Sequence, residues 1–353
     1  MTNYTVPKER IKYFDLLKGL AIFTVVMGHV LTMCIREIDS AFLFKIIETV
    51  HMPVFFFISG YLTYKIRFKN PNLGKRFKQL MIPYFIVSAL WIWYFPHSGL
   101  KSPISSSVPE MYCSYWKDGY WFTLCLFEMF LIYFPLAKIF SKISNLSVQI
   151  VIATGVYAFL AILSVYFSTP QKDIFGLGLL ATFYPVFMTG VFAHRCKEYY
   201  KMMTAGGVWF LIGLILFVPA WYVTTYYWEF PMIPEWFAFI ANPIKYFGFI
   251  IIAVTLVIPW SEKEFSADRK PGKIARYFNF LGQESLAIYL LHYFFLFPLT
   301  PLQEPLRAMG LSIVPLMIVT VFFTFSIIGI TLFVNYAVKR NKWLALLLTG
   351  KEL

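Results

Sequence analysis

Residues 14–35, FDLLKGLAIFTVVMGHVLTMCI, form the first long apolar run of the chain and indicate its fold class. A helix rises about 1.5 Å per residue, so about 20 apolar residues cross the hydrocarbon core of a bilayer. Comparable runs recur along the rest of the sequence. We predict ten transmembrane spans, at residues 14–35, 43–64, 79–96, 121–140, 148–168, 174–193, 206–226, 240–259, 279–300 and 312–336.

The composition agrees with this class. Of the 353 residues, 59% are apolar and only 14% are charged, whereas a soluble domain carries about a quarter charged residues. No linker or change of composition divides the chain. We therefore predict an all-α, polytopic integral membrane protein. One transmembrane domain, residues 14–336, lies between a cytoplasmic N-terminal segment, 1–13, and a cytoplasmic tail, 337–353.

The basic residues predict the orientation of the spans. The net charge of +13 lies between the apolar runs rather than on one face of a soluble fold, which argues against a nucleic-acid partner. About 24 of the 31 Lys and Arg residues fall in segments that alternate regularly with poorer ones. By the positive-inside rule, the richer segments and both termini are cytoplasmic, in a multi-pass protein of the inner (cytoplasmic) membrane. The outer segments hold Arg36, Lys45, Lys101, Lys117, Lys172, Lys245 and Arg307.

Three ionisable residues lie in the first span, where each is costly and therefore a candidate for function. Asp15 and Lys18 lie at its cytoplasmic end, and His29 lies deeper. Lys18 and His29 are separated by three helical turns, so they share one stripe, about 16 Å apart along the axis. Such a stripe can hold one end of an elongated ligand at the cytosolic surface and the other inside the membrane. Taken singly, Lys18 is equally well explained as a snorkelling interfacial charge. For His29 the structural explanation, a histidine hydrogen-bonded between helices, is the less favoured of the two.

Three further polar residues are expected at the depth of His29. Counting residues from the ends of their spans places His51, Glu128 and His292 at one level, somewhat outside the midplane. A shared internal cavity is the simplest explanation. A metal site is a lesser alternative, because no pair of these residues has the spacing of helical metal ligands and the four cysteines form no CxxC motif.

The motifs of this sequence, and the order in which they occur, resemble those of the membrane-bound acyltransferase-3 family. That family includes O-acetyltransferases of bacterial surface polysaccharides. The first motif, Arg10-x-x-x-x-Asp15-x-x-Lys18-Gly19-Leu20-Ala21, leads into the first span and ends at His29. The match continues through His51-Met52-Pro53-x-Phe55-Phe56-Phe57-x-Ser59-Gly60-Tyr61, Lys75-Arg76 before Pro83-Tyr84, Trp121-Phe122-x-Leu124, and Gly282-x-x-Ser285-x-x-x-Tyr289-Leu290-x-His292. Lys18 stands where the family usually has arginine, and lysine keeps the charge but not the planar fork.

The resemblance implies about ten membrane helices and an acyl-CoA-dependent O-acyltransferase that modifies an extracytoplasmic or lipid-linked saccharide. No permanently bound cofactor is expected, since acetyl-CoA is a donor substrate. The family's essential histidine corresponds to His29, which either deprotonates the acceptor hydroxyl or carries the acyl group transiently. Glu128 and His51 are candidates to orient His29. Asp15, Lys18, Ser59, Lys75 and Arg76 are candidates to bind the donor, and Trp121, Tyr289 and His292 are candidates to line the acceptor cavity.

Two other classes of protein compete with this interpretation. A secondary transporter would use the polar cluster to relay protons or bind solute, although we find no internal repeat. A polysaccharide-export or scaffold protein would retain the fold without turnover. Release of free CoA that depends on an acceptor distinguishes the enzyme from both.

Overall fold

The computed structural model describes residues 10–35, 42–64, 72–100, 108–115, 117–169, 172–173, 175–204, 206–226, 235–309 and 312–351. Across these ranges the chain forms helices and no named strand, so the predicted all-α membrane fold is confirmed. Nine of the described helices are long and apolar enough to cross a membrane. They are α1 (Lys12–His29, continued by the π-helix Val30–Ile35), α2 (Phe42–Thr63), α3 (Leu73–Tyr94), α5 (Trp121–Phe140), α6 (Leu146–Phe167), α7 (Leu177–Arg195), α9 (Gly207–Tyr226), α10 (Ala238–Glu264) and α13 (Ile313–Val338).

A bent pair of helices lies at the position of the tenth predicted span, and its two parts are long and apolar enough to cross a membrane when they are taken together. The pair consists of α11 (Lys273–Leu291) with the 3-10 segment η6 (His292–Phe295), and of α12 (Thr300–Ala308), and it bends by 95° at the break. The predicted span 279–300 differs from this, because α11 begins earlier and the chain turns before residue 300. Pro298 lies in the break, and proline lacks the N–H group that a continuing helix needs. The remaining short helices are α4 (Val108–Cys113), α8 (Lys197–Thr204) and α14 (Lys342–Thr349), with the 3-10 segments η2 (Phe95–His97), η3 (Lys117–Gly119) and η5 (Glu235–Phe237).

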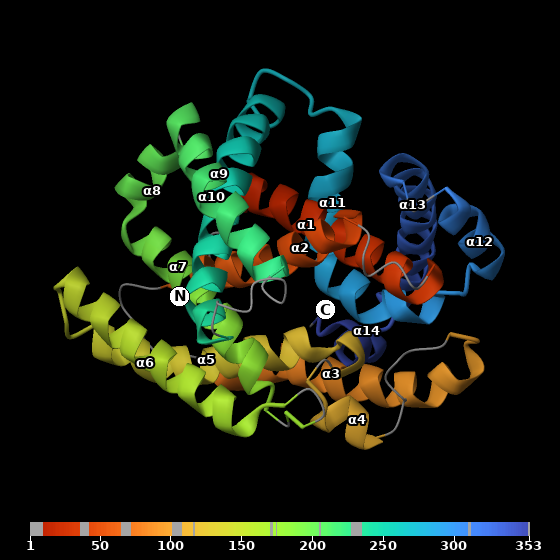
Figure 1. The fold of residues 1–353 in the computed structure, drawn as a ribbon, viewed down its shortest axis with the longest axis horizontal. Coiled ribbons are helices and arrows are strands. Elements are labelled where there is room, and N and C mark those ends of the chain that lie inside the picture. Colours follow the sequence, from red (N-terminus) through yellow and green to blue (C-terminus); the bar gives the residue numbers. More distant parts are fainter. Residues whose placement is uncertain are drawn as a thin grey trace, which may run out of the picture.

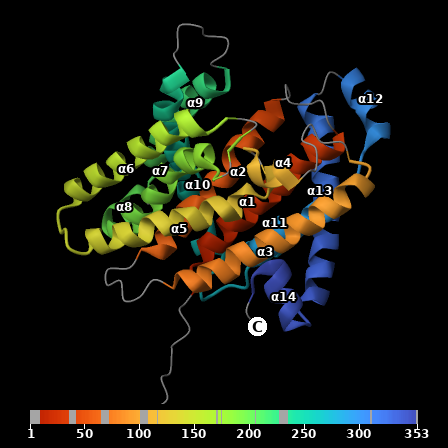
Figure 2. The ribbon, with the colours of Figure 1, turned by 90° about the horizontal axis from the view of Figure 1, so that it is seen from below.

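Helix α1 forms the centre of the bundle (Figure 1). In its most apolar stretch 61% of the residues are buried within the protein, compared with 17% in α6 and α9. Because α6 and α9 are apolar but little buried, their exposed surface suits contact with lipid chains. A second view shows α3 beside α14 near the C-terminus (Figure 2), so the end of the chain packs back onto the bundle.

Two glycines allow α1 and α11 to touch at the backbone. A Cβ atom at Gly19 would lie 1.8 Å from the carbonyl oxygen of Phe278, and one at Gly282 would lie 1.8 Å from that of Asp15. Small residues are favoured where membrane helices approach this closely. His29 lies fourteen residues after Asp15, and Tyr293 lies eleven residues after Gly282. These two residues are joined by a hydrogen bond. The two helices therefore run parallel, and α11 accompanies α1 from Asp15 to His29.

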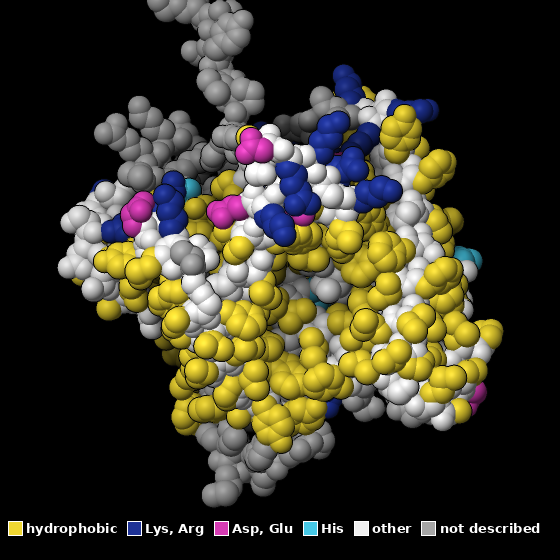
Figure 3. Space-filling view, turned by 90° about the horizontal axis from the view of Figure 1, so that it is seen from above, with side chains coloured by type: hydrophobic (Ala, Val, Ile, Leu, Met, Phe, Trp, Pro, Cys, Tyr) yellow, Lys and Arg dark blue, Asp and Glu magenta, His cyan; other side chains and the backbone are white. Residues whose placement is uncertain are grey.

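The surface is strongly divided by charge. Figure 3 shows Lys and Arg side chains gathered at one end of the molecule, above a broad apolar region that is hollowed near its middle. We call this end, where α1 begins and α13 ends, the basic end. It corresponds to the side that the positive-inside rule predicts to be cytoplasmic.

Candidate active site

His29 lies where the helical path of its own span changes. It is the last residue of α1, and the chain continues as a π-helix from Val30. π-helical turns are rare and occur frequently at functional sites. The Nε2 atom of His29 is 2.8 Å from the hydroxyl of Tyr293, and this hydrogen bond joins α1 to η6. One ring nitrogen is thus held by a phenol, while Nδ1 remains available.

His29 borders an internal space. Protein atoms surround its ring deep in the bundle, yet the residue is only partly buried by surface area. His51 on α2 has the same combination of depth and partial exposure, and it lies within electrostatic range of His29. Depth in the bundle combined with exposed surface indicates a hollow beside the side chain. A ligand in this hollow would meet both imidazoles.

His292 is fully buried beside His29, with 5.2 Å between the ring centroids. Its Nδ1–H donates to the carbonyl of Ile288 at 2.8 Å, which leaves the lone pair of a neutral ring on Nε2. That Nε2 atom is buried and has no hydrogen-bond partner. The Nδ1–H of His51 likewise donates to the carbonyl of Ile47, at 2.5 Å. Both rings therefore offer an acceptor nitrogen, which suits a ligand that brings O–H or N–H donors.

The segment η3 closes the site from the outer-loop side. Tyr289 donates a hydrogen bond to the carbonyl of Gly119 at 2.6 Å. Gly119 has a φ of +89°, and a Cβ atom there would lie 1.8 Å from the hydroxyl of Tyr293. Glycine is needed at this turn both for its backbone conformation and for the room that it leaves to Tyr293. The loop and the phenol next to His29 are thus positioned together.

Glu128 groups with residues other than the histidines. Its electrostatic neighbours are Lys117 and Asp173, and one of its carboxylate oxygens is buried without a hydrogen-bond partner. Lys117 is fully buried, and its ammonium donates to the carbonyl of Ser114 at 2.9 Å and to that of Asp173 at 2.5 Å. Burial lowers the pKa of Lys117, and the negative charge of Asp173 opposes this. No described contact joins Glu128 to His29. The two residues were grouped by their depth in the membrane, and depth does not specify which neighbours a helix face meets.

At the basic end, the predicted donor residues lie on three helices. Lys18 forms an ion pair with Asp15 at 2.7 Å, and Arg10 lies 4.0 Å from the same carboxylate. On α3, Lys75 is exposed, while the Arg76 guanidinium packs 4.8 Å from the ring centroid of Phe130.

The predicted residues Ser59 and Trp121 differ in their surroundings. Ser59 on α2 is partly exposed, next to Gly60, which packs against the backbone of Phe187 on α7. Trp121 is buried and stacks on Phe183, with 5.4 Å between the ring centroids. Ser59 thus retains surface for a ligand, whereas Trp121 packs in an aromatic layer with Phe56 and Phe183. Among the described residues, no group of three His, Cys, Asp or Glu side chains could hold a metal ion.

Comparison with known proteins identifies the family. A family model described as an acyltransferase domain matches residues 11–335, nearly the whole chain. The chain belongs to the acyltransferase-3 family. The predicted resemblance is therefore confirmed, and the family and the apolar helices together make the chain a multi-pass membrane protein.

Two curated relatives of this acyltransferase-family chain are nodulation proteins NolL. The one from Sinorhizobium fredii is 31% identical over 198 residues, which cover 52% of this chain and 49% of the relative. The one from Mesorhizobium japonicum is 30% identical over 156 residues, which cover 40% of this chain and 39% of the relative. The matched part thus spans about half the length of these relatives or less. No solved structure matches the chain.

The structure adds residues to the site of this family member that the sequence analysis did not select. Tyr293 follows His292 directly, and its position next to a candidate residue was the available signal. Glu284 lies within the Gly282 to Ser285 motif, yet its partners Lys339 and Lys351 lie in the tail, which no motif marked. Contacts between residues so far apart become visible only in the folded chain.

Proposed function

We propose that this chain is an O-acyltransferase of the inner membrane. It moves an acyl group, in the simplest case acetyl, from acyl-CoA at the basic end to a hydroxyl of a saccharide on the opposite side or linked to lipid. The observation that carries the proposal is His29, which borders an internal hollow three helical turns from the Asp15–Lys18 pair. The family of the chain supports the same chemistry.

His29 acts as the base in the proposed reaction. In the reactive form, Nε2–H donates to the oxygen of Tyr293 and Nδ1 carries the lone pair. The acceptor hydroxyl gives its proton to Nδ1 as its oxygen attacks the thioester carbonyl. The new C–O bond forms, the C–S bond breaks, and the leaving thiolate takes up the proton. Tyr293 continues to accept from Nε2 while the imidazolium exists, which stabilises the charge.

Other residues serve binding in this proposal. Asp15, Lys18, Lys75 and Arg76 receive the nucleotide end of the donor, and Ser59 lines the path of its pantetheine arm. His51 and His292 accept hydrogen bonds from ligand donors, and Tyr289 holds the loop that closes the cavity. Trp121 supports the aromatic wall. Glu128 orders the outer loop through its electrostatic interaction with Lys117.

His29→Ala tests the proposal. Loss of a general base costs roughly 100-fold or more, so acceptor-dependent release of CoA from labelled acetyl-CoA should fall at least that far. His97→Ala is the matched control, since His97 is an exposed histidine outside the cluster. Both variants are first checked for folding by thermal unfolding in detergent. Wild-type turnover by a well-folded His29→Ala protein would rule out the proposed role.

The acceptor requires a separate experiment. Surface glycans are compared by mass spectrometry and NMR in cells that carry the wild-type gene, the His29→Ala gene or no gene. We expect an ester-linked acyl group that appears only with the wild-type gene. Identical glycans in all three strains would exclude a surface saccharide as the acceptor.

A further inference from the structure

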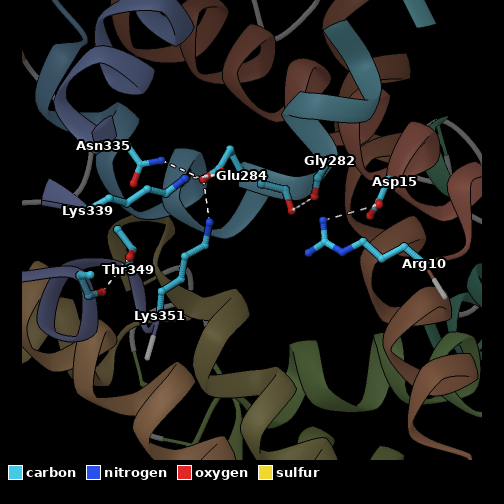
Figure 4. A network of polar contacts seen from close by, with 10 residues as sticks. Arg10, Asp15, Gly282, Glu284, Asn335, Lys339, Thr349 and Lys351 are labelled. Carbon is cyan, nitrogen blue, oxygen red and sulfur yellow. Dashed lines mark hydrogen bonds and ion pairs between the residues drawn. The ribbon is translucent and has the colours of Figure 1, made fainter. Parts of the chain in front are cut away.

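A buried carboxylate at the basic end collects two lysines from the tail. Glu284, whose side chain is 9% exposed, accepts from Lys339 at 2.6 Å through one oxygen and from Lys351 at 2.7 Å through the other. Asn335 also donates to Glu284, at 2.9 Å, and keeps the carboxylate in place. Figure 4 shows the two lysines reaching the same carboxylate from different parts of the tail.

The ammonium groups of this cluster retain unused binding capacity. Each ammonium has three N–H donors, and the described contacts of Lys339 and Lys351 use one donor each, on Glu284. Their side chains remain 30% and 32% exposed, so the other donors can reach a ligand. Burial lowers the pKa of Lys351 although Glu284 opposes this, and a bound anion would offset the cost of burying the charge.

The cluster adjoins the Asp15–Lys18 pair. Glu284 comes two residues after Gly282, which packs on the backbone of Asp15. Arg10 and Lys18 share Asp15, just as the tail lysines share Glu284, so four cations face two carboxylates and a net charge of about +2 remains. Glu284 is eight residues before His292, which is about 12 Å along the helix. The cluster therefore lies about two turns of α11 nearer the basic end than His292.

We infer that Lys339 and Lys351, held in position by Glu284, form a binding site for a phosphate of the nucleotide half of the acyl donor. The inference rests on the proposed function, because acyl-CoA is the anionic substrate that the reaction supplies at this end. The carboxylate aligns the ammonium groups before the ligand arrives, and one positive charge remains to attract it. The tail beyond α13 is thereby part of the donor site.

A donor that lacks the nucleotide tests this inference. The KM is measured for acetyl-CoA and for S-acetylpantetheine, which carries the same thioester but no phosphate. Lys351→Gln should raise the KM for acetyl-CoA about tenfold, the effect of losing one charge-assisted hydrogen bond. It should leave the KM for S-acetylpantetheine unchanged, which also shows that the variant is folded. Lys342→Gln is the control, because it removes an exposed lysine from the same tail.

The outcomes separate the inference from the proposed function. An equal loss with both donors would make Lys351 a structural clamp, and no loss with either would leave it without a role in donor binding; either result overturns the inference. If wild-type protein uses neither donor, the proposed function fails. Calorimetric binding of CoA to wild type and Lys351→Gln then tests the phosphate site alone.

Both proteins are assayed in phosphatidylcholine nanodiscs with and without phosphatidylglycerol. A difference that requires phosphatidylglycerol would assign the site to a lipid headgroup instead.

Discussion

The hydrogen bond between His29 and Tyr293 is the most informative contact at the scale of single residues. The phenol holds one nitrogen of the imidazole and leaves the other toward the hollow. Tyr293 is itself enclosed, with its ring centroid 4.2 Å from that of His292 and 4.8 Å from that of Tyr120. A ring packed in this way cannot turn away, so it limits the orientations open to His29.

Tyr293→Phe should slow the reaction without unfolding the protein. The substitution keeps the aromatic packing but removes the hydroxyl that steadies the charged imidazole. We expect kcat to fall about tenfold or more, since a hydrogen bond to a charged group contributes roughly 1.5–3 kcal/mol. The rising limb of the pH dependence of kcat should shift to lower pH, because the charged imidazole loses the hydroxyl that stabilises it and His29 therefore stays neutral down to a lower pH.

Tyr157→Phe is the control for this change. Its hydroxyl donates to the carbonyl of Phe239, in contact with neither the histidines nor Tyr293. It should leave kcat and its pH profile unchanged. If Tyr293→Phe also leaves both unchanged, the phenol is only a packing element.

At the scale of helices, the contact between α1 and α11 decides whether the site assembles. Gly19 and Gly282 bring the two backbones together near the basic end, and the parallel path then carries His29 to η6. The chain changes from α-helix to 3-10 helix at His292, so the consecutive residues His292 and Tyr293 both belong to η6 and both rings lie next to His29. Two departures from regular α-helix, one on each element, therefore meet at the candidate site.

Gly282→Ala should damage both stability and activity. The added methyl group would lie 1.8 Å from the backbone oxygen of Asp15, so α11 has to move away from α1. Overpacking of this kind costs about 1–3 kcal/mol of the free energy of unfolding. A displacement of about 1 Å can lower a rate by roughly 100-fold. The transfer rate should therefore fall strongly even if most of the protein remains folded. Thermal unfolding in detergent and the transfer rate measure the two effects.

Gly329→Ala on α13 provides the comparison, since nothing lies within 4 Å of a Cβ atom at that position. Alanine favours helix more than glycine does, so this variant should be as stable as wild type or slightly more stable. Equal behaviour of the two variants would show that α1 and α11 can separate without consequence.

At the scale of the whole molecule, the division of charge sets the direction of transfer. The basic side chains gather at one end (Figure 3), and both donor candidates, the Asp15–Lys18 pair and the Glu284 cluster, lie at that end. The positive-inside rule predicts that this end is cytoplasmic, where acyl-CoA is found.

Fusions test this orientation. Green fluorescent protein joined to the C-terminus should fluoresce, and alkaline phosphatase at the same place should be inactive, because the tail is expected to remain in the cytoplasm. Alkaline phosphatase joined after residue 100, following α3, should be active. The opposite pattern would place the donor site on the wrong side of the membrane and contradict the proposed function.

Apolar length and the placement of charge were sufficient to predict the membrane fold. Nine of the ten predicted spans correspond to single helices, because crossing a bilayer requires a length that can be counted. The tenth differs where Pro298 breaks the helix. Helix α3 begins earlier than predicted because the side chain of Asn72 accepts from the backbone of Lys75, so a basic first turn precedes the apolar run.

Neighbours across the bundle were decided only by tertiary structure. Counting turns correctly put His29 and His292 at a common depth, but it could not find Tyr293 as the partner of His29, 264 residues away. The same count grouped Glu128 with the histidines, whereas packing turned it toward Lys117. It also gave no sign that Lys351 returns to Glu284. Periodicity specifies the depth and face of a residue within its own helix, while the element that meets this face depends on contacts such as those of Gly19 and Gly282.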